Sequence, residues 1–237
     1  MFCRFICGLS VCVIFAAASF PAQPYEEITL PVDGTIEGKV TFQGHVPKRK
    51  IIPTKNKDIC GGIRDEPRIH VSDDKGVQDA IVYLKKVKKG KPWGNFAQQP
   101  RIDNKDCRFE PHVQVIRPGA IDIHNSDPIL HNTHGFYGRR TAFNLALPKK
   151  GLTISKQLKR PGKVRVECDA HGWMLAWVYV ADSPYHTITG QQGGFNISNI
   201  PPGDYTLVVT QNYLGDVNLP VTVKAGETSR VDIEMKK

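Results

Sequence analysis

The sequence predicts an all-β protein that is made of β-sandwiches. Short runs in which apolar and polar residues alternate recur along the chain, and Gly, Pro, Asn and Asp separate them. No segment shows a sustained helical repeat of apolar residues. The 21 glycines and 17 prolines among 237 residues suit the many turns of such a fold. Strands at this spacing are typical of sandwiches, and the chain is long enough for two of them.

The N-terminal segment has the pattern of a secretory signal peptide. The basic residue Arg4 precedes an apolar run over residues 5–20, and small residues lie near the end of this run at Ala16–Ala18. This order predicts a signal peptide over residues 1–22. The run is too short to span a bilayer, and no later segment is long enough to do so. We therefore expect an exported protein, periplasmic or extracellular (or at the cell surface), with no transmembrane segment after signal removal.

The strands follow in chain order from this segment onward. Most runs alternate apolar and polar residues between turn residues, as expected of a strand with one buried face. The clearest runs are 35–42, 80–84, 113–116, 120–124, 164–168, 176–180, 194–197, 205–210 and 231–234.

The cysteines indicate one disulfide and one remaining thiol. Three of the six cysteines lie in the predicted signal peptide, which leaves Cys60, Cys107 and Cys168. An odd number in an oxidising compartment means that one thiol is unpaired or bound to something. Cys60 and Cys107 both lie in loops flanked by Gly or Asp, so we predict that they pair. Cys168 is then left for another role.

The segment that follows the strand at residues 164–168 brings soft donors together. The strand ends on Cys168, which alternation places on the same inward face as Val164 and Val166. His171 and Met174 follow in the spacing C-x2-H-x2-M. Thiolate, imidazole and thioether are the donors of copper electron-transfer sites. Zinc also accepts thiolate and imidazole, but a thioether is a poor zinc ligand, so the pattern favours copper.

A further nitrogen donor is expected from an upstream strand. The segment after Asn125 offers His131 and His134, and residue spacing alone leaves both open. On a strand they should face opposite sides, because they are three residues apart.

Residues 100–182 resemble a cupredoxin, most of all the amicyanin and plastocyanin type. The matching residues are Phe109-x-Pro111, Gly119, Asn125-x-Asp127, His131-Asn132, His134, Gly162 and Cys168-x-x-His171-x-x-Met174. The resemblance implies a Greek-key sandwich that holds one type 1 (blue) copper ion, Cu(I)/Cu(II). It implies His131, Cys168 and His171 as equatorial ligands and Met174 as the axial ligand. It also places Asn132 beside the ligands, tying the two ligand loops together, and makes His134 a non-ligand.

The flanking residues are similar to carboxypeptidase regulatory-like (transthyretin-like) sandwiches. The first part, residues 28–95, contains Gly34-Thr-Ile-Glu-Gly38, and the second part, residues 186–237, contains Pro201-Pro-Gly203-Asp-Tyr205. The resemblance implies one sandwich that is interrupted by the cupredoxin segment, an insertion that a loop tolerates when the insert's ends are close. Two sandwiches in tandem remain the alternative.

These features favour an exported electron-transfer protein over two rivals. A copper carrier or scavenger would use the same ligands, and a cell-surface interaction protein would hold metal only incidentally. The formal charge of +9 comes from basic clusters scattered among turns, which excludes nucleic acid as the partner and fits either a solvated surface or an acidic redox partner. Signatures of hydrolases, zinc enzymes and phosphate-binding enzymes are missing, so no catalysis is expected.

We also expect the ring edge of His171 to be exposed as the exit for electrons, because this residue lies in a loop. Trp173 and Trp177 flank Met174, and they either pack over the loop or form an apolar docking patch.

Overall fold

The protein, described here by a computed structural model over residues 25–94 and 99–237, is built from β-strands and the turns and loops between them. The described part has one short helix, α1 (Lys57–Cys60). The all-β class is therefore confirmed. The predicted signal peptide, residues 1–22, lies outside the described residues. Within the described ranges, no helix has the length and apolar character needed to cross a membrane.

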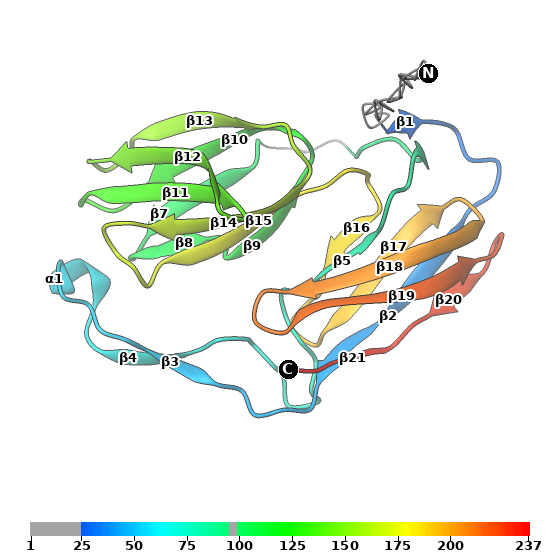
Figure 1. Ribbon diagram of the computed structural model, residues 1–237, viewed down its shortest axis with the longest axis horizontal. Coiled ribbons are helices and arrows are strands. Elements are labelled where there is room, and N and C mark those ends of the chain that lie inside the picture. Colours follow the sequence, from blue (N-terminus) through cyan, green and yellow to red (C-terminus); the bar gives the residue numbers. More distant parts are fainter. Residues whose placement is uncertain (1–24, 95–98) are drawn as a thin grey trace, which may run out of the picture.

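The first sandwich consists of two facing sheets built from residues 101–180 (Figure 1). One sheet has the order β13 (Thr153–Leu158), β10 (Gly119–Asn125), β7 (Arg101–Lys105) and β8 (Arg108–Glu110). The other has the order β12 (Arg140–Leu147), β11 (His131–Tyr137), β14 (Gly162–Cys168), β15 (Leu175–Val180) and β9 (Val113–Ile116). The pairs β10–β7 and β15–β9 are parallel, and the remaining pairs are antiparallel. This is the Greek-key sandwich that the sequence predicts.

Alternation along the strands determines which side chains enter the first core. On β14, Val164, Val166 and Cys168 are at most 1% exposed, whereas the two residues between them are only partly buried. On β11, His131 and Thr133 are fully buried in the same way. Because side chains alternate between the faces of a sheet, the same pattern turns His131, the first residue of β11, and Cys168, the last residue of β14, inward. The inward residues at one end of the core are therefore a thiol and an imidazole.

The second sandwich also has two sheets, formed by residues from both ends of the chain. One sheet has the order β16 (His186–Ile188), β5 (Ile81–Leu84), β18 (Gly203–Gln211) and β19 (Gly215–Val223). The other has the order β17 (Gly194–Ile200), β2 (Gly34–Phe42) and β20 (Thr228–Arg230), and β21 (Ile233–Met235) also pairs with β2. A small pair, β1 (Glu26–Glu27) and β6 (Lys89–Gly90), lies beside it.

A compact apolar contact joins the two sandwiches. The rings of Tyr83 on β5 and Tyr179 on β15 lie with their centroids 4.7 Å apart. Ile81 and Val113 pack in the same cluster and are almost fully buried. Lys163 on β14 adds an ion pair with Asp216 on β19, with an Nζ–Oδ1 distance of 3.0 Å. The two sandwiches thus contact each other through residues of β5 and β15 that point away from the two cores, at a distance from the ends of β11 and β14 that carry His131 and Cys168.

A long excursion from the second sandwich reaches the far end of the first. It consists of β3 (Lys48–Ile51), α1 and β4 (Arg64–Pro67), and we call residues 48–67 the cap. Strands β3 and β4 form a sheet of their own, and Figure 1 shows the cap running along the first sandwich with α1 at its outer end. The disulfide Cys60–Cys107 connects α1 to the turn between β7 and β8. The cap is thereby fixed against the end of the sandwich where β11 and β14 bring their polar residues inward.

Candidate metal centre

Three buried donor residues come from adjacent strands and the loop that follows. His131 is the first residue of β11, Cys168 is the last of β14, and His171 lies in the loop before β15. Strands β11 and β14 are antiparallel neighbours, with Thr133 opposite Cys168, so the two ends that carry donors meet. The exposed fractions of the three residues are 0%, 1% and 1%, respectively. Water is therefore excluded from the space between them.

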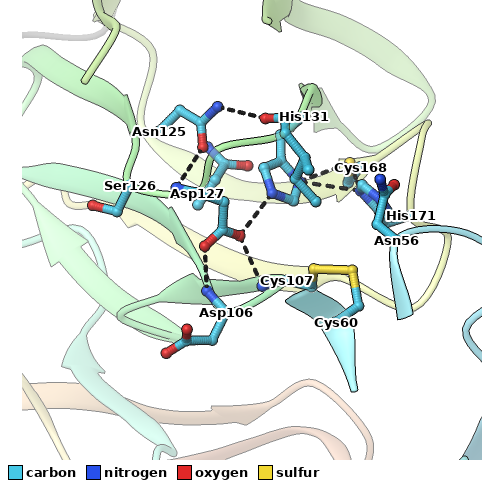
Figure 2. Close-up of polar contacts among 12 residues, drawn as sticks. Asn56, Cys60, Asp106, Cys107, Asn125, Ser126, Asp127, His131, Cys168 and His171 are labelled. Atoms are coloured by element: carbon cyan, nitrogen blue, oxygen red, sulfur yellow. Dashed lines mark hydrogen bonds and ion pairs between the residues drawn. A yellow bond between two sulfur atoms is a disulfide. The ribbon is translucent and has the colours of Figure 1, made fainter. Parts of the chain in front are cut away.

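The three donor atoms form a triangle of the size that one metal ion needs. Cys168 Sγ lies 3.8 Å from His131 Nδ1 and 3.7 Å from His171 Nδ1, and the two Nδ1 atoms are 3.1 Å apart (Figure 2). The centre of such a triangle is about 2.1 Å from each corner, close to the roughly 2.0–2.3 Å of metal–nitrogen and metal–sulfur bonds in proteins. Two imidazoles and a thiolate in a trigonal set suit copper. The donors therefore fit a single ion of this kind.

Asp127 orients the ring of His131. Its Oδ2 lies 2.8 Å from His131 Nε2, and the backbone N–H groups of Asp106 and Cys107 donate to its two oxygens at 2.8 and 2.9 Å (Figure 2). Because a carboxylate accepts, Nε2 carries the proton and Nδ1 presents its lone pair to the centre of the donor triangle. Burial lowers the pKa of His131, although its bond to Asp127 acts in the opposite direction. A carboxylate behind a ligating imidazole is a common arrangement in metal sites.

The ring of His171 is sealed by the cap, contrary to our expectation. The side chain of Asn56 places Oδ1 3.2 Å from His171 Nε2. Burial, the nearby ring of His131 and the charge of Lys55 lower the pKa of His171 to about 4. The ring is therefore neutral at physiological pH, as a ligand must be. The expectation of an exposed ring edge is wrong, because the segment that covers it comes from 115 residues away in the chain.

The thiol of Cys168 accepts a hydrogen bond from the backbone of β11. The backbone N–H of Asn132 donates to Cys168 Sγ at 3.4 Å, which links β11 to the end of β14. Burial raises the pKa of this thiol, and backbone hydrogen bonds from Asn132, His171 and Ala170 offset that only in part. A buried thiolate here thus needs a positive charge beside it, as a bound cation would supply.

Asn132 and His134, which both follow His131, lie away from the donor triangle. The side-chain amide of Asn132 donates to Asn144 Oδ1 on β12 at 2.7 Å, so its backbone rather than its side chain connects the two ligand segments. The ring of His134 contacts Asp169 and Thr141, at 3.1 and 3.0 Å. His134 therefore faces the other side of β11.

Met174 closes the loop that begins at Cys168. The N–H of His171 donates to Cys168 O at 3.2 Å, and the N–H of Met174 donates to His171 O at 2.9 Å. These two bonds keep the loop short. Met174 is 2% exposed and belongs to the same buried cluster as Cys168.

The disulfide lies directly beside the donors. The two sulfur atoms of Cys60 and Cys107 and a ring nitrogen of His171 all lie within 4.8 Å of one another. Sequence reasoning finds this pair but not its position next to the donors. It also misses the roles of Asp127 and Asn56. Asp127 is one of the residues that match the cupredoxin pattern, but the match assigns it no role, and Asn56 has no sequence signal because its contact is made only in the folded chain.

The second sandwich matches a known family. Residues 162–236 match the model of the carboxypeptidase regulatory-like domain. The match begins in β14, so it includes two strands of the first sandwich as well as β16–β21.

One curated relative is a much longer protein. A probable rhamnogalacturonate lyase A from Aspergillus flavus is 38% identical over 61 residues. This region makes up 26% of the present chain and 11% of the lyase. The chain thus spans about a tenth of the length of that relative.

Solved structures similar to the chain include three copper proteins. Amicyanin from Paracoccus versutus is 15% identical, with 42% of this chain and 97% of that chain covered and a TM-score of 0.32. A purple cupredoxin from Nitrosopumilus maritimus is 20% identical, with coverages of 35% and 100% and a TM-score of 0.31. A copper-containing nitrite reductase from Thermus scotoductus is 18% identical, with coverages of 39% and 25% and a TM-score of 0.31.

Proposed function

We propose that the chain is an exported mononuclear type 1 copper protein that carries electrons. The observation that supports this most strongly is the buried triangle of Cys168 Sγ, His131 Nδ1 and His171 Nδ1, with sides of 3.1–3.8 Å. Met174 is proposed as the weak fourth ligand. Copper bound there would supply a one-electron Cu(I)/Cu(II) couple.

The chain's own residues supply rigidity and exclude water. Asp127 fixes the ring of His131, and the backbone N–H of Asn132 fixes the position of Cys168 Sγ. Asn56 fixes the ring of His171 from the cap. Hydrogen bonds of this kind hold ligands in one geometry, so little rearrangement accompanies a change in oxidation state.

A copper carrier or scavenger is the second candidate, and the cap argues against it. A carrier that releases copper quickly needs a route from the ligands to solvent. Here His171 is 1% exposed and lies beneath Asn56, and a disulfide fixes the cap to the first sandwich. This arrangement favours copper that stays bound while electrons move.

The remaining assignments belong to the same proposal. We assign residues 100–182 to a cupredoxin domain inserted between residues 28–95 and 186–237 of the regulatory-like sandwich. The described strands support this order, since β2 and β5 precede β7–β15 in the chain and pair with strands that follow β15. We assign no catalytic reaction to the chain. Its place is the periplasm, the extracellular space or the cell surface, where a redox partner would reach its basic surface.

Copper loading of the purified mature protein tests the proposed function. An intense visible thiolate-to-Cu(II) absorption band and an EPR signal of one copper per chain are expected, and both should be lost in Cys168→Ala. His134→Ala is the matched control, because His134 lies on the other face of β11 and should leave the band unchanged. A wild-type protein that binds copper without the band would overturn the proposal.

A further inference from the structure

Because His171 is buried, electrons must pass between the donor residues and the surface through another side chain. Trp173, two residues along the loop, has its ring centroid 5.2 Å from that of His171. Its indole N–H donates to Cys107 O at 3.2 Å, which holds the ring against the disulfide-bonded turn. Trp173 is only partly buried, whereas His171 and Met174 are almost completely buried. Trp173 is therefore the residue of the ligand loop that combines ring contact with His171 and access to the outside.

Trp173 lies on the wall of a cavity of about 420 Å³. Its other walls come from the cap and the residues just after it, from the start of β8 and from residues 211–213 of the second sandwich. Its volume falls within the roughly 300–1,000 Å³ of small-molecule sites. A cavity of this size admits a small molecule, but a protein surface would contact only its rim. These parts of the fold together line a partly open cavity beside the ligand loop.

The charges on the walls favour an anion. The lining residues include three arginines, Arg49, Arg68 and Arg108, and one carboxylate, Glu66. Glu66 already accepts from Arg49 and Arg108, at 3.3 and 3.0 Å. Arg68 lies over the ring of Tyr213, 6.0 Å from its centroid, and forms no ion pair with a carboxylate in the described part of the chain. The walls thus carry an excess of positive charge that the protein does not neutralise.

Aromatic rings also line this cavity. Trp173, Trp177 and Tyr213 all border it. The indole Nε1 of Trp177 has no hydrogen-bond partner among the described residues, but it is shielded from solvent and therefore also from a ligand in the cavity. A ligand with a negative charge and a flat face would match the arginines and these rings.

We propose that this cavity binds a small organic anion that exchanges electrons with the copper site through Trp173. The inference rests on the proposed function and names its partner as a small molecule instead of a docked protein. When the anion is the reductant, it would lose one electron, release the proton of an acidic O–H to solvent and leave as a radical; a copper ion held by His131, Cys168 and His171 would supply the Cu(II)/Cu(I) couple that accepts the electron. Arg68 fixes the charged group, and Trp173 is the contact between the ligand and His171.

Calorimetric titration of the full-length mature protein, free of copper, tests binding without any redox activity. The probes are the ascorbate monoanion and neutral hydroquinone. Ascorbate is expected to bind saturably and hydroquinone more weakly. Arg68→Gln should weaken ascorbate binding about tenfold, since a charge-assisted hydrogen bond is lost. Arg139→Gln is the matched control, because this exposed arginine lies in the turn at the other end of β11 from His131 and removes the same charge.

Stopped-flow reduction of the copper-loaded protein then tests the route. The rate should saturate with ascorbate concentration, and Arg68→Gln should raise the half-saturation concentration without lowering the maximal rate. Trp173→Leu, or Trp173→Phe if the former does not fold, should lower the maximal rate while the visible spectrum stays that of the wild type. Saturable ascorbate binding by a protein that shows no blue band would overturn the proposed function and leave the cavity site standing. A blue protein whose ascorbate affinity is absent, or unchanged in Arg68→Gln, would overturn this inference alone. Reduction only by a protein partner would also overturn it.

Discussion

The carboxylate of Asp127 shows how single residues prepare this site. It accepts from two backbone N–H groups and from His131, so all of its contacts are donors. The carboxylate is only 4% exposed and yet well compensated, as a buried charge must be. Its effect is to fix which nitrogen of His131 is free to bind a metal.

Asp127→Asn should weaken copper binding without removing it. The amide has one acceptor oxygen for three donors, so its NH2 group must face a donor and the ring of His131 loses its fixed orientation. We expect copper affinity to fall by about 10- to 100-fold, the usual cost of losing the partner of a ligating histidine. Competition with a chelator of known affinity measures this. Asp106→Asn is the control, because Asp106 contributes only its backbone N–H to this network. Equal affinities in the wild type and Asp127→Asn would contradict the role given to Asp127.

Residue types and spacing predict part of this site and miss the rest. C-x2-H-x2-M after a strand indicates donors for a soft metal ion. Strand alternation places His131 and His134 on opposite faces without saying which is the ligand, and the cupredoxin resemblance is what assigns His131. The bond between Asn56 and His171 has no such signal. It connects residues that are 115 positions apart, and neither motif nor periodicity relates them.

At the scale of elements, the cap determines what reaches the metal centre. It contains the two-stranded pair β3–β4 and the short helix α1. One disulfide and the ion pair between Glu66 and Arg108 anchor it to the first sandwich. Its sequence is rich in Lys and Arg and shows no sustained apolar repeat. From sequence, the basic cluster at Lys48–Lys50 therefore indicates either a solvated surface or a site for a partner. In the folded chain it belongs to β3, which is part of the cap.

Removing the disulfide with Cys60→Ser/Cys107→Ser should loosen the cap. The bond closes a loop with a sequence separation of 47, for which chain entropy gives about 4 kcal/mol of stabilisation. We expect faster transfer of copper to a chelator and a lower free energy of unfolding, measured by competition kinetics and denaturant titration. Ile63→Ser, which changes an exposed cap residue, should affect neither. Unchanged copper release in the double variant would show that the disulfide does not control access.

Glu66 should make the attachment of the cap sensitive to acid. Burial alone would raise its pKa, but hydrogen bonds from Arg64 and Arg108 outweigh burial and lower it from 4.5 to about 2. A carboxyl group whose pKa is lowered in the folded state stabilises that state above its ordinary pKa. That contribution is lost as the pH falls from about 4.5 towards about 2. The protection factors of the β4 amides, which correct each exchange rate for its intrinsic dependence on pH, should therefore fall over this range in the wild type. In Glu66→Gln the protection factors should be lower at neutral pH and should change less with acid. An identical pH profile of protection would contradict this assignment.

At the scale of the whole molecule, two sandwiches cooperate around one buried centre. The second sandwich contributes the cap, and it also contributes a wall of the cavity beside Trp173. The class of both sandwiches is predictable, because strand periodicity and local motifs lie within each of them. How they meet is not, because contacts such as Tyr83 with Tyr179 depend on the register of distant strands. The sequence likewise suggests an exposed His171, because nothing in it indicates that the cap reaches this ring.

Anomalous diffraction at the copper edge from crystals of the copper-loaded protein tests the central claim most directly. A single strong peak per chain is predicted inside the triangle of Cys168 Sγ, His131 Nδ1 and His171 Nδ1, at about 2.0–2.3 Å from each atom. A peak elsewhere, or no peak within bonding distance of Cys168 Sγ, would contradict it.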